Sequence, residues 1–446
     1  MQLNRLSGNS RDMGWKDKQA HCAGSVFFRG QLAPRPEEFS HLEKQGVTLR
    51  ATPEREGSHW HLTLAHPKWG TAQAMCLKHA PLPPRVIFEW DPGLTDEERQ
   101  EAQLGASSVS VIMEGVRGDI LRDRKALLWF LGAIAGQEGV VAIDHSSERC
   151  WSRASLDEEL CHDASLDIEA MFVLHAVRAN AESKTTDWLH THGLASIGLL
   201  DFDILRPSAE LLGRSRDLLR AIALGIAEGG VTRNMPSWRL AGPAFDVGFM
   251  DAASFMAAGP RWARDIRTAT DKGHTEDRTI LVEPGKWWKP RRLFGAEPSR
   301  FLSGEQPDDL LIQFSDDATF LMQTRARAMY PLLRRLAEEM REFDFTVAVK
   351  LGYEADAGNG RKEHLWFRVH AAEDTRVDAT LLNHPFNIAR IHKGERGWHD
   401  TGRLTDWMIL TPLGQITPRD VMLARRIRAN RDKLLKLMRE QRATAK

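Results

Sequence analysis

The amino-acid sequence predicts an α+β fold with two domains, of which the C-terminal one is a small curved antiparallel sheet packed by flanking helices. Three observations lead to this prediction. The chain has 446 residues, more than a single hydrophobic core usually accommodates. Short strand-like and helix-like segments alternate through its first half. Near its end, a helical stripe of apolar residues precedes a run with apolar residues at every second position.

The composition is that of a globular protein, with 42% hydrophobic and 27% charged residues. The 61 Lys and Arg residues balance the 61 Asp and Glu residues, so no overall field would attract nucleic acid or an anionic membrane. The sequence shows no signal-peptide pattern and no apolar run long enough to cross a bilayer. We therefore expect a cytoplasmic protein whose thiols are reduced; its scattered cysteines are Cys22, Cys76, Cys150 and Cys161.

Residues 1–23 are polar and are predicted to form a flexible N-terminus. Residues 24–230 are predicted to form an α/β or α+β domain. Thr95 and Glu98 have the spacing of a capping box, so a helix is expected to begin there. The other expected helices are 124–135, 156–178 in one or two pieces, and 211–228. The expected strands are 25–28, 59–64, 86–90, 108–113, 140–143 and the run within 187–205.

Residues 231–307 are predicted to form a connector or insertion, because prolines are spread through them. These prolines are at positions 236, 243, 260, 284, 290, 298 and 307.

Residues 308–421 are predicted to form the second domain. The stripe from Met322 to Phe343 predicts a helix facing the core, with a break near Tyr330 caused by Pro331. Strands over 345–351 and 365–369 are expected to form a hairpin, and further strands are expected at 377–382, 388–392 and 404–410. Residues 418–446 are predicted to form a basic helix capped by Thr417.

Three motifs lie in this second domain: Glu363-His364-x-Trp366, Asn383-x-Pro385 and Asp406-Trp407. Their order along the chain resembles DUF2314, a bacterial family of unknown function, over about residues 308–421. The earlier segment with Trp188, His192-Gly193, Asp201 and Asp203 is similar to uncharacterised bacterial domains of the DUF4026 or DUF4261 type. Neither resemblance implies an established activity.

The rim of the C-terminal sheet is the first candidate site, a binding surface. Tryptophan combines a large apolar area with a polar N–H, which suits recognition. The competing interpretations are general acid–base chemistry by Glu363 and His364, or a structural role in which these side chains and Asn383 fix turns. The candidate residues are Glu363, His364, Trp366, Asn383, Asp406 and Trp407.

The second candidate is a metal site. His190 and His192 would point to the same side of a strand, and Asp201 and Asp203, with His175, could complete the ligand set. The alternative is a turn stabilised by Gly193. The third candidate is a nucleic-acid contact, for which aromatic and basic residues interleave at Lys286, Trp287, Trp288, Lys289, Arg291 and Arg292, with the basic C-terminal helix in addition.

The sequence contains no Walker motif, no GxGxxG after a strand and no GxSxG. These observations favour a non-catalytic bacterial protein that binds another macromolecule, most simply a protein, in an accessory or immunity-like role. The alternatives are a metal-assisted hydrolase that uses His190 and His192, and a nucleic-acid-binding protein. No cofactor is expected in the first case, and a divalent metal in the second.

Overall fold

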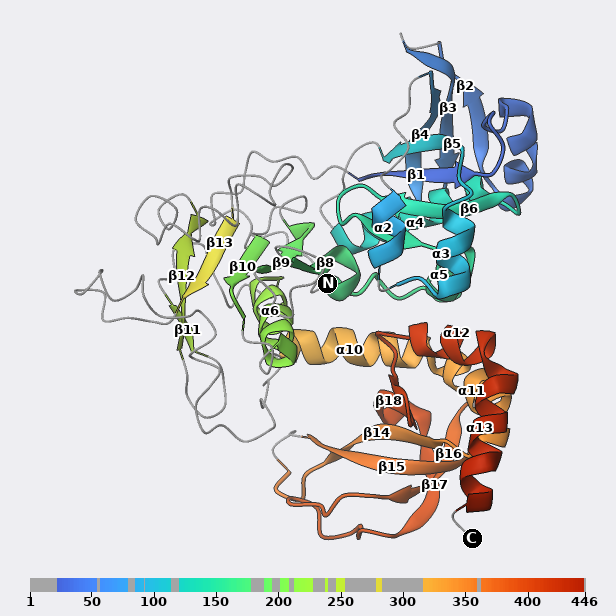
Figure 1. Cartoon of the computed structure of the whole chain (residues 1–446). Coiled ribbons are helices and arrows are strands. Elements are labelled where there is room, and N and C mark those ends of the chain that lie inside the picture. Colours follow the sequence, from blue (N-terminus) through green and yellow to red (C-terminus); the bar gives the residue numbers. More distant parts are fainter. Residues whose placement is uncertain are drawn as a thin grey trace, which may run out of the picture. The chain divides into compact units, whose positions relative to one another are not determined.

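The computed structural model divides the chain into two compact units, which we describe separately. Unit 1 comprises Met1–Asp91, Gln100–Asp157 and Leu166–Ser315, and unit 2 comprises Pro92–Arg99, Glu158–Ser165 and Asp316–Lys446. Figure 1 labels the elements of both units. The structure describes residues 22–53, 57–78, 85–91, 93–113, 120–177, 188–194, 201–207, 212–227, 237–239, 246–252, 278–282, 316–358 and 362–444.

Unit 1 contains a seven-stranded antiparallel sheet, sheet A, in the order β2-β3-β4-β5-β1-β6-β7. Helix α4 (Ile120–Ala135) packs on one face of it, where a Cβ atom on Gly24 would lie 2.8 Å from the Leu131 side chain. The strands are β1 Ala23–Phe28, β2 Thr48–Ala51, β3 Ser58–His66, β4 Gly70–Leu77, β5 Ser107–Met113, β6 Gly139–Asp144 and β7 Arg149–Trp151.

Short helices lie between the strands of sheet A along the chain and directly after them. The capping box predicted at the start of α3 (Asp96–Ala102) is confirmed, since the Thr95 N–H donates to Glu98 Oε2 at 2.7 Å and the Glu98 N–H donates to Thr95 Oγ1 at 3.2 Å. The strand predicted at 86–90 is wrong, because Arg85–Trp90 forms helix α2. A short apolar run fits a strand or a buried helix equally well, and here the ring of Phe88 packs on Phe27. The 3-10 helix η1 (Pro36–Gln45) and α5 (Arg153–Leu160) complete this region.

Sheet B, also in unit 1, has the order β11-β12-β13-β10-β9-β8, with β10 and β13 parallel and the other neighbours antiparallel. Helix α6 (Leu212–Ala227) follows β10, close to the prediction. The strands are β8 Val173–Val177, β9 Trp188–His192, β10 Asp201–Leu205, β11 Ser237–Arg239, β12 Asp246–Asp251 and β13 Arg278–Val282.

One prediction fails in sheet B. The helix expected at 156–178 ends at Leu160, and after a 3-10 turn, η2 (Ile168–Met171), the chain pairs with β9 as β8. Pairing with a neighbouring strand here outweighs a helical pattern, as β-propensity depends on context. Residues 231–307, expected to form a connector or insertion, contribute β11, β12 and β13 to sheet B. None of the prolines in this range lies within these three strands, where it would interrupt a ladder.

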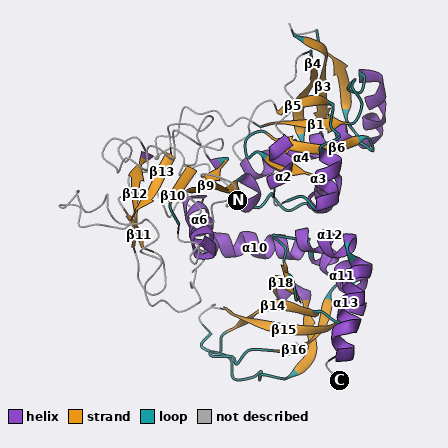
Figure 2. Ribbon diagram, in the orientation of Figure 1, coloured by secondary structure: helices purple, strands orange, loops and turns teal. Residues whose placement is uncertain are grey.

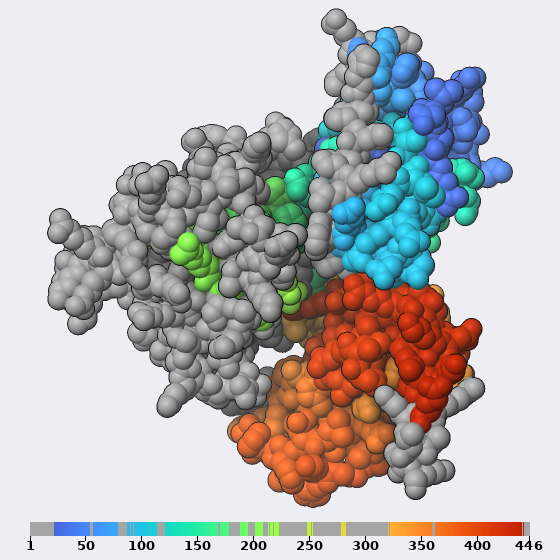
Figure 3. Space-filling view, viewed as in Figure 1, coloured from blue at the N-terminus to red at the C-terminus, as the bar shows by residue number. Residues whose placement is uncertain are grey.

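Unit 2 is built on sheet C, six antiparallel strands in the order β17-β16-β15-β14-β18-β19 that do not close into a barrel. Figure 2 shows the strands of sheet C with their helices, and the described part of residues 316–444 forms one continuous orange-to-red body in Figure 3. The α+β class and the predicted hairpin of β14 and β15 are confirmed. The strands are β14 Thr346–Glu354, β15 Lys362–Ala372, β16 Arg376–Leu381, β17 Arg396–Asp400, β18 Leu404–Thr411 and β19 Gly414–Ile416.

Helices α10 (Asp316–Ala328) and α11 (Tyr330–Glu339) cover the inner face of sheet C, and the predicted break at Pro331 separates them. Trp407 on β18 is fully buried in this core, and its Nε1–H donates to the Ala326 carbonyl at 3.1 Å. The core also contains Leu333, Leu336, Val349, Leu351, Leu365, Phe367 and Ile409. The short 3-10 helices η6 (Arg341–Phe343) and η7 (Thr401–Arg403) connect these elements.

The strand predicted at 388–392 is wrong, because residues 382–395 form a loop. The predicted C-terminal helix is two helices, α12 (Met422–Ala429) and α13 (Arg431–Thr444), which meet at Asn430. Thr417 does not cap a helix: its hydroxyl accepts the Asp420 N–H in a turn, and α12 begins only afterwards. None of the described helices is long and apolar enough to span a membrane.

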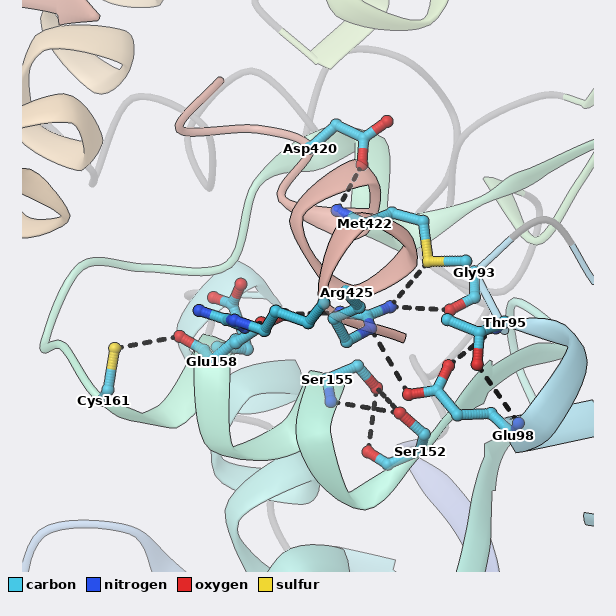
Figure 4. Close-up of polar contacts among 12 residues, drawn as sticks. Gly93, Thr95, Glu98, Ser152, Ser155, Glu158, Cys161, Asp420, Met422 and Arg425 are labelled. Carbon is cyan, nitrogen blue, oxygen red and sulfur yellow. Dashed lines mark hydrogen bonds and ion pairs between the residues drawn. The ribbon is translucent and has the colours of Figure 1, made fainter. Parts of the chain in front are cut away.

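Arg425 of α12 takes part in ion pairs inside unit 2 (Figure 4). Arg425 contacts Glu158 at 2.5 Å and Glu98 at 3.4 Å, and donates to the Gly93 carbonyl at 2.7 Å. Burial raises the pKa of Glu158, and the charges of Arg425 and Arg428 oppose that shift. Arg425 is buried, whereas Arg426 and Arg428 on the same helix are exposed.

Candidate functional site

The loop of residues 382–395 is the main feature of unit 2 that is exposed and also held in a fixed conformation. Glu363, at the start of β15, accepts hydrogen bonds from the backbone N–H groups of Phe386 and Asn387, each at 2.8 Å. Both carboxylate oxygens are used, one for each N–H. Hydrogen bonds to an ionised acceptor are about twice as strong as neutral ones. The Glu363 side chain therefore holds the centre of the loop, as its structural interpretation expected.

Further side chains of the β14–β15 hairpin and of the loop fix its two flanks. The Trp366 N–H donates to Asn383 Oδ1 at 2.8 Å, which holds the start of the loop against β15. On the other flank, Asp356 accepts the Ala389 N–H at 2.6 Å and pairs with Arg390. The backbone of the loop is thus attached at its start, centre and second half.

Phe386 is presented to solvent by this clamped backbone. Its side chain is 91% exposed, although the backbone N–H is bound by Glu363. Leu382 at the start of the loop is 40% exposed. A groove of about 660 Å³ lies along the loop, and its walls are Asp356, His384, Pro385, Phe386, Asn387, Ile388, Ala389, Ile391, His392 and Lys393. The loop thus combines an exposed aromatic ring with an adjoining concave surface.

The outer face of sheet C, opposite the helices, carries three of the predicted residues, Asp406, Trp366 and His364. Asp406, Lys350 and Trp366 lie in register across β18, β14 and β15, with Lys350 Nζ 5.6 Å from the Trp366 ring centroid. Burial raises the pKa of Asp406, against the Trp407 N–H and the charge of Lys350, which lower it.

His364 lies on the same face as Trp366, with its Nδ1 atom 3.1 Å from the Thr405 hydroxyl. Burial, together with the charges of Lys350 and Lys362, lowers its pKa. Glu363 next to it points to the loop and binds backbone N–H groups. The two side chains therefore serve separate structural contacts, and no described contact couples them as an acid–base pair.

Trp407 was predicted as part of the binding surface, and this prediction is wrong. Its side chain is 0% exposed, because alternation along β18 places it on the inner face while its neighbour Asp406 lies on the outer one. The predicted set therefore separates into loop anchors, outer-face residues and one core residue. Phe386 and Asp356 were missed, although Phe386 directly follows the Asn383-x-Pro385 motif.

The histidines of the predicted metal site come together in sheet B. His175 pairs with His190 across β8 and β9, and its ring centroid lies 5.3 Å from that of His190 and 5.9 Å from that of His192. His192 Nε2 is 3.1 Å from Glu148 Oε1. Burial lowers the pKa of His192, but Glu148 outweighs this and leaves it raised.

The two aspartates of that predicted site have other contacts. Asp203 forms a buried ion pair with Arg278, whose Nε lies 2.9 Å from Asp203 Oδ1, and Asp201 accepts the Thr191 hydroxyl at 2.8 Å. Among the residues that the structure describes, no group of three or more His, Cys, Asp or Glu side chains has a metal-binding arrangement. The metal site stays a prediction.

Gly193 explains the turn that follows His192. Its φ of +117° is a backbone conformation that side chains rarely allow, and a Cβ there would lie 2.8 Å from the Met171 carbonyl oxygen and from Ser147 Cα. The glycine thus lets the end of β9 approach the chain around Ser147.

The predicted nucleic-acid contact at Lys286, Trp287, Trp288, Lys289, Arg291 and Arg292 lies outside the described residues. On the basic C-terminal helices, Arg425 pairs with Glu158, Arg428 with Glu158 and Glu339, and Arg431 with Glu342. These three bases are paired with acids within unit 2, whereas Arg426 on α12 and Lys433 and Lys436 on α13 are exposed. The nucleic-acid contact stays a prediction.

Comparison with family models identifies two segments of the chain. Residues 318–417 match DUF2314, described as an uncharacterized protein conserved in bacteria, and this range runs from the first turn of α10 to the end of β19. Residues 174–282 match the C-terminal domain of DUF4026, a protein of unknown function, and this range covers sheet B. Both resemblances read from the sequence are confirmed. Searches of curated proteins and of solved structures find no match.

Proposed function

We propose that this protein is a non-catalytic interaction protein with an accessory, immunity-like role, and that it binds another protein through the 382–395 loop. The observation that carries this proposal is the exposure of Phe386 on a backbone that Glu363 holds in place. Large aromatic side chains often supply most of the binding energy of an interface when they enter a pocket on the partner.

The fixed loop supports this proposal energetically. Ordering a flexible segment on binding costs free energy, and a segment that is already ordered avoids much of that cost. The contacts of Glu363, Asn383 and Asp356 order the loop in the free protein. The backbone that carries the ring therefore needs no further ordering when a partner arrives. An exposed ring on a loop without such anchors would bind at a larger cost in ordering the loop.

Photo-crosslinking in the bacterial cell tests the proposal. A benzoylphenylalanine placed at position 386 is expected to crosslink to one discrete protein partner. The matched control is the same residue at position 320, because Phe320 on α10 is also an exposed phenylalanine, at 56%. Equal crosslinking at both positions, or none at position 386, would contradict the proposal.

Removal of the Phe386 ring allows its contribution to the binding affinity to be measured. Phe386→Ala is expected to weaken binding of the crosslinked partner by at least about 2 kcal/mol, which is about 30-fold in Kd, whereas Phe320→Ala leaves it unchanged. Because Phe386 is 91% exposed, its removal is expected to leave the unfolding midpoint of the chain unchanged. A loss of binding would then report the contact itself.

A further inference from the structure

We propose that two copies of this chain pair edge to edge through strand β17 (Arg396–Asp400), so that sheet C continues from one copy into the other. This self-association is separate from the binding at the 382–395 loop proposed above. Three features of β17 lead to it. The strand is an open edge of the sheet, half of its backbone groups point away from the sheet, and its charges complement those of an identical strand that runs in the opposite direction.

β17 is the last strand of sheet C on one side (Figure 1). It pairs with β16, and no strand among the described residues pairs with its other side. The opposite edge is different, because α12 packs beside β19, where a Cβ on Gly414 would lie 3.5 Å from the Leu423 side chain. Proteins often protect an open edge with a proline or a bulge, and β17 contains neither. β17 is therefore able to accept a further strand.

The backbone groups of every second residue of β17 point away from the sheet. At one end the Leu381 N–H donates to the Glu395 carbonyl at 2.9 Å, and at the other end the Thr401 N–H donates to the Thr375 carbonyl at 3.0 Å. Backbone groups alternate in direction along an antiparallel strand, so residues 397 and 399 also face β16, whereas residues 396, 398 and 400 face away from it. An identical antiparallel strand, centred on residue 398, would pair its own three outward residues with these three.

In this register the side chains of the two strands are complementary. Residues 396 and 400 stand at equal distances from Trp398 along the strand, so Arg396 of each copy would face Asp400 of the other. The two Trp398 side chains would face each other at the centre. Opposite charges and aromatic pairs at facing positions stabilise antiparallel strands, and like charges destabilise them. In-register parallel pairing would place Arg396 beside Arg396 and Asp400 beside Asp400, so the charges favour the antiparallel arrangement.

The three outward residues are accessible and keep atoms for a second copy. Trp398 is 48% exposed, and Arg396 and Asp400 are exposed as well. Arg396 binds Asp378 through Nε and Nη2, and no described contact uses its Nη1. Asp400 accepts the Gly402 N–H through Oδ1 at 2.6 Å, and no described contact uses its Oδ2. The pairing therefore adds contacts without breaking those that hold β17 in the single chain.

The contact is small, since it consists of one strand of five residues and its copy. Stable interfaces bury about 1,600 Å² in total, and smaller ones are weak or transient. We therefore expect a dimer that forms and dissociates with the concentration of the chain.

Sedimentation velocity of the full-length chain, from about 1 μM to 1 mM, measures this association. The wild type is expected to pass from monomer to dimer in this range. Arg396→Glu and Asp400→Lys each place like charges at two facing positions of the dimer, so each is expected to raise Kd at least about tenfold. An equimolar mixture of the two variants should regain the association, because a strand with two acids then faces a strand with two bases. The matched control is Lys433→Glu, an exposed lysine on α13, which should leave Kd unchanged.

Hydrogen–deuterium exchange of the wild type supplies a readout that needs no variant. The amides of residues 396, 398 and 400 should exchange more slowly as the concentration rises, whereas those of residues 397 and 399 should be slow throughout. This comparison decides the proposal if a charge variant has a lowered unfolding midpoint.

A wild-type chain that stays monomeric up to 1 mM would overturn the proposal. So would a dimer whose Kd neither charge variant changes, or folded variants whose mixture does not regain the association. Slow exchange of the three outward amides only when a cell extract is added would assign the edge to a strand of another protein instead.

Discussion

Replacing Glu363 by glutamine tests the clamp on which the interaction surface depends. In the protein, the two carboxylate oxygens accept the N–H groups of Phe386 and Asn387, each at 2.8 Å. Glutamine keeps one acceptor and turns an NH₂ group toward the other N–H. Glu363→Gln therefore removes one hydrogen bond outright and takes the charge from the second.

The size of the effect follows from the value of a hydrogen bond to a charged group. Such bonds contribute about 1.5–3 kcal/mol, and the half-buried position of Glu363 places this one near the lower end. A loss of about 1.5 kcal/mol in the local opening of the loop corresponds to roughly tenfold faster exchange of the two amides. The global unfolding midpoint should not change, because the loop opens without the core.

Hydrogen–deuterium exchange of the full-length chain measures this directly at Phe386 and Asn387. The control is Glu373→Gln at the far end of β15, since Glu373 is exposed, contacts Arg376 and does not touch the loop. It should leave the exchange of both amides as in the wild type. The clamp would be refuted if Glu363→Gln left the two amides unchanged, or if it accelerated exchange equally throughout β14 and β15.

Three further predictions concern stability. Gly193→Ala should destabilise unit 1 by at least about 2 kcal/mol in urea unfolding, because Gly193 has a positive φ and two backbone atoms would lie 2.8 Å from the new Cβ. The control Gly213→Ala on α6 has no atom within 4 Å of the new Cβ and should be neutral or stabilising, so equal effects of the two changes would contradict this prediction. Arg278→Met should lower the free energy of unfolding by about 3–5 kcal/mol, because it leaves the buried Asp203 carboxylate unpaired. Adding Asp203→Leu should recover much of this loss. A double variant that is no more stable than Arg278→Met would refute the contribution of the pair. Burial lowers the pKa of His399 below its ordinary 6.5, so the stability that neutral His399 contributes is present above that pH and is lost as the pH falls below it. The unfolding midpoint should therefore drop on acidification in the wild type and drop less in His399→Gln. Parallel pH curves for the two proteins would contradict this prediction.

The sequence predicted best where one physical signal determined the element. Apolar residues at every second position identified β14 and the hairpin it forms with β15. Pro331 separated α10 from α11 because it lacks the N–H that a continuous helix needs. The predictions failed where a short segment had no periodicity of its own, as at residues 86–90, or where pairing with another strand decided the conformation, as in β8.

The candidate site shows the same limit. The sequence selected Glu363, Asn383 and Trp366 as members of a motif, and these residues do meet at one loop. It did not separate Asp406 from Trp407, although one lies on the outer face and the other in the core. It also did not single out Phe386, because the exposure of a side chain depends on which other parts of the chain cover it in the folded protein. The local sequence pattern does not show this.

By itself, the sequence determined the fold class, the helix break at Pro331, the alternation of the C-terminal strands and the two family resemblances, because each depends on local pattern or motif order. Only the tertiary structure decided that residues 382–395 form a clamped loop instead of a strand, that residues 237–282 supply strands of sheet B, and that Asp203 binds Arg278. Each of these depends on contacts between segments far apart in the chain. Such contacts arise from burial and pairing in three dimensions, which a single sequence does not display.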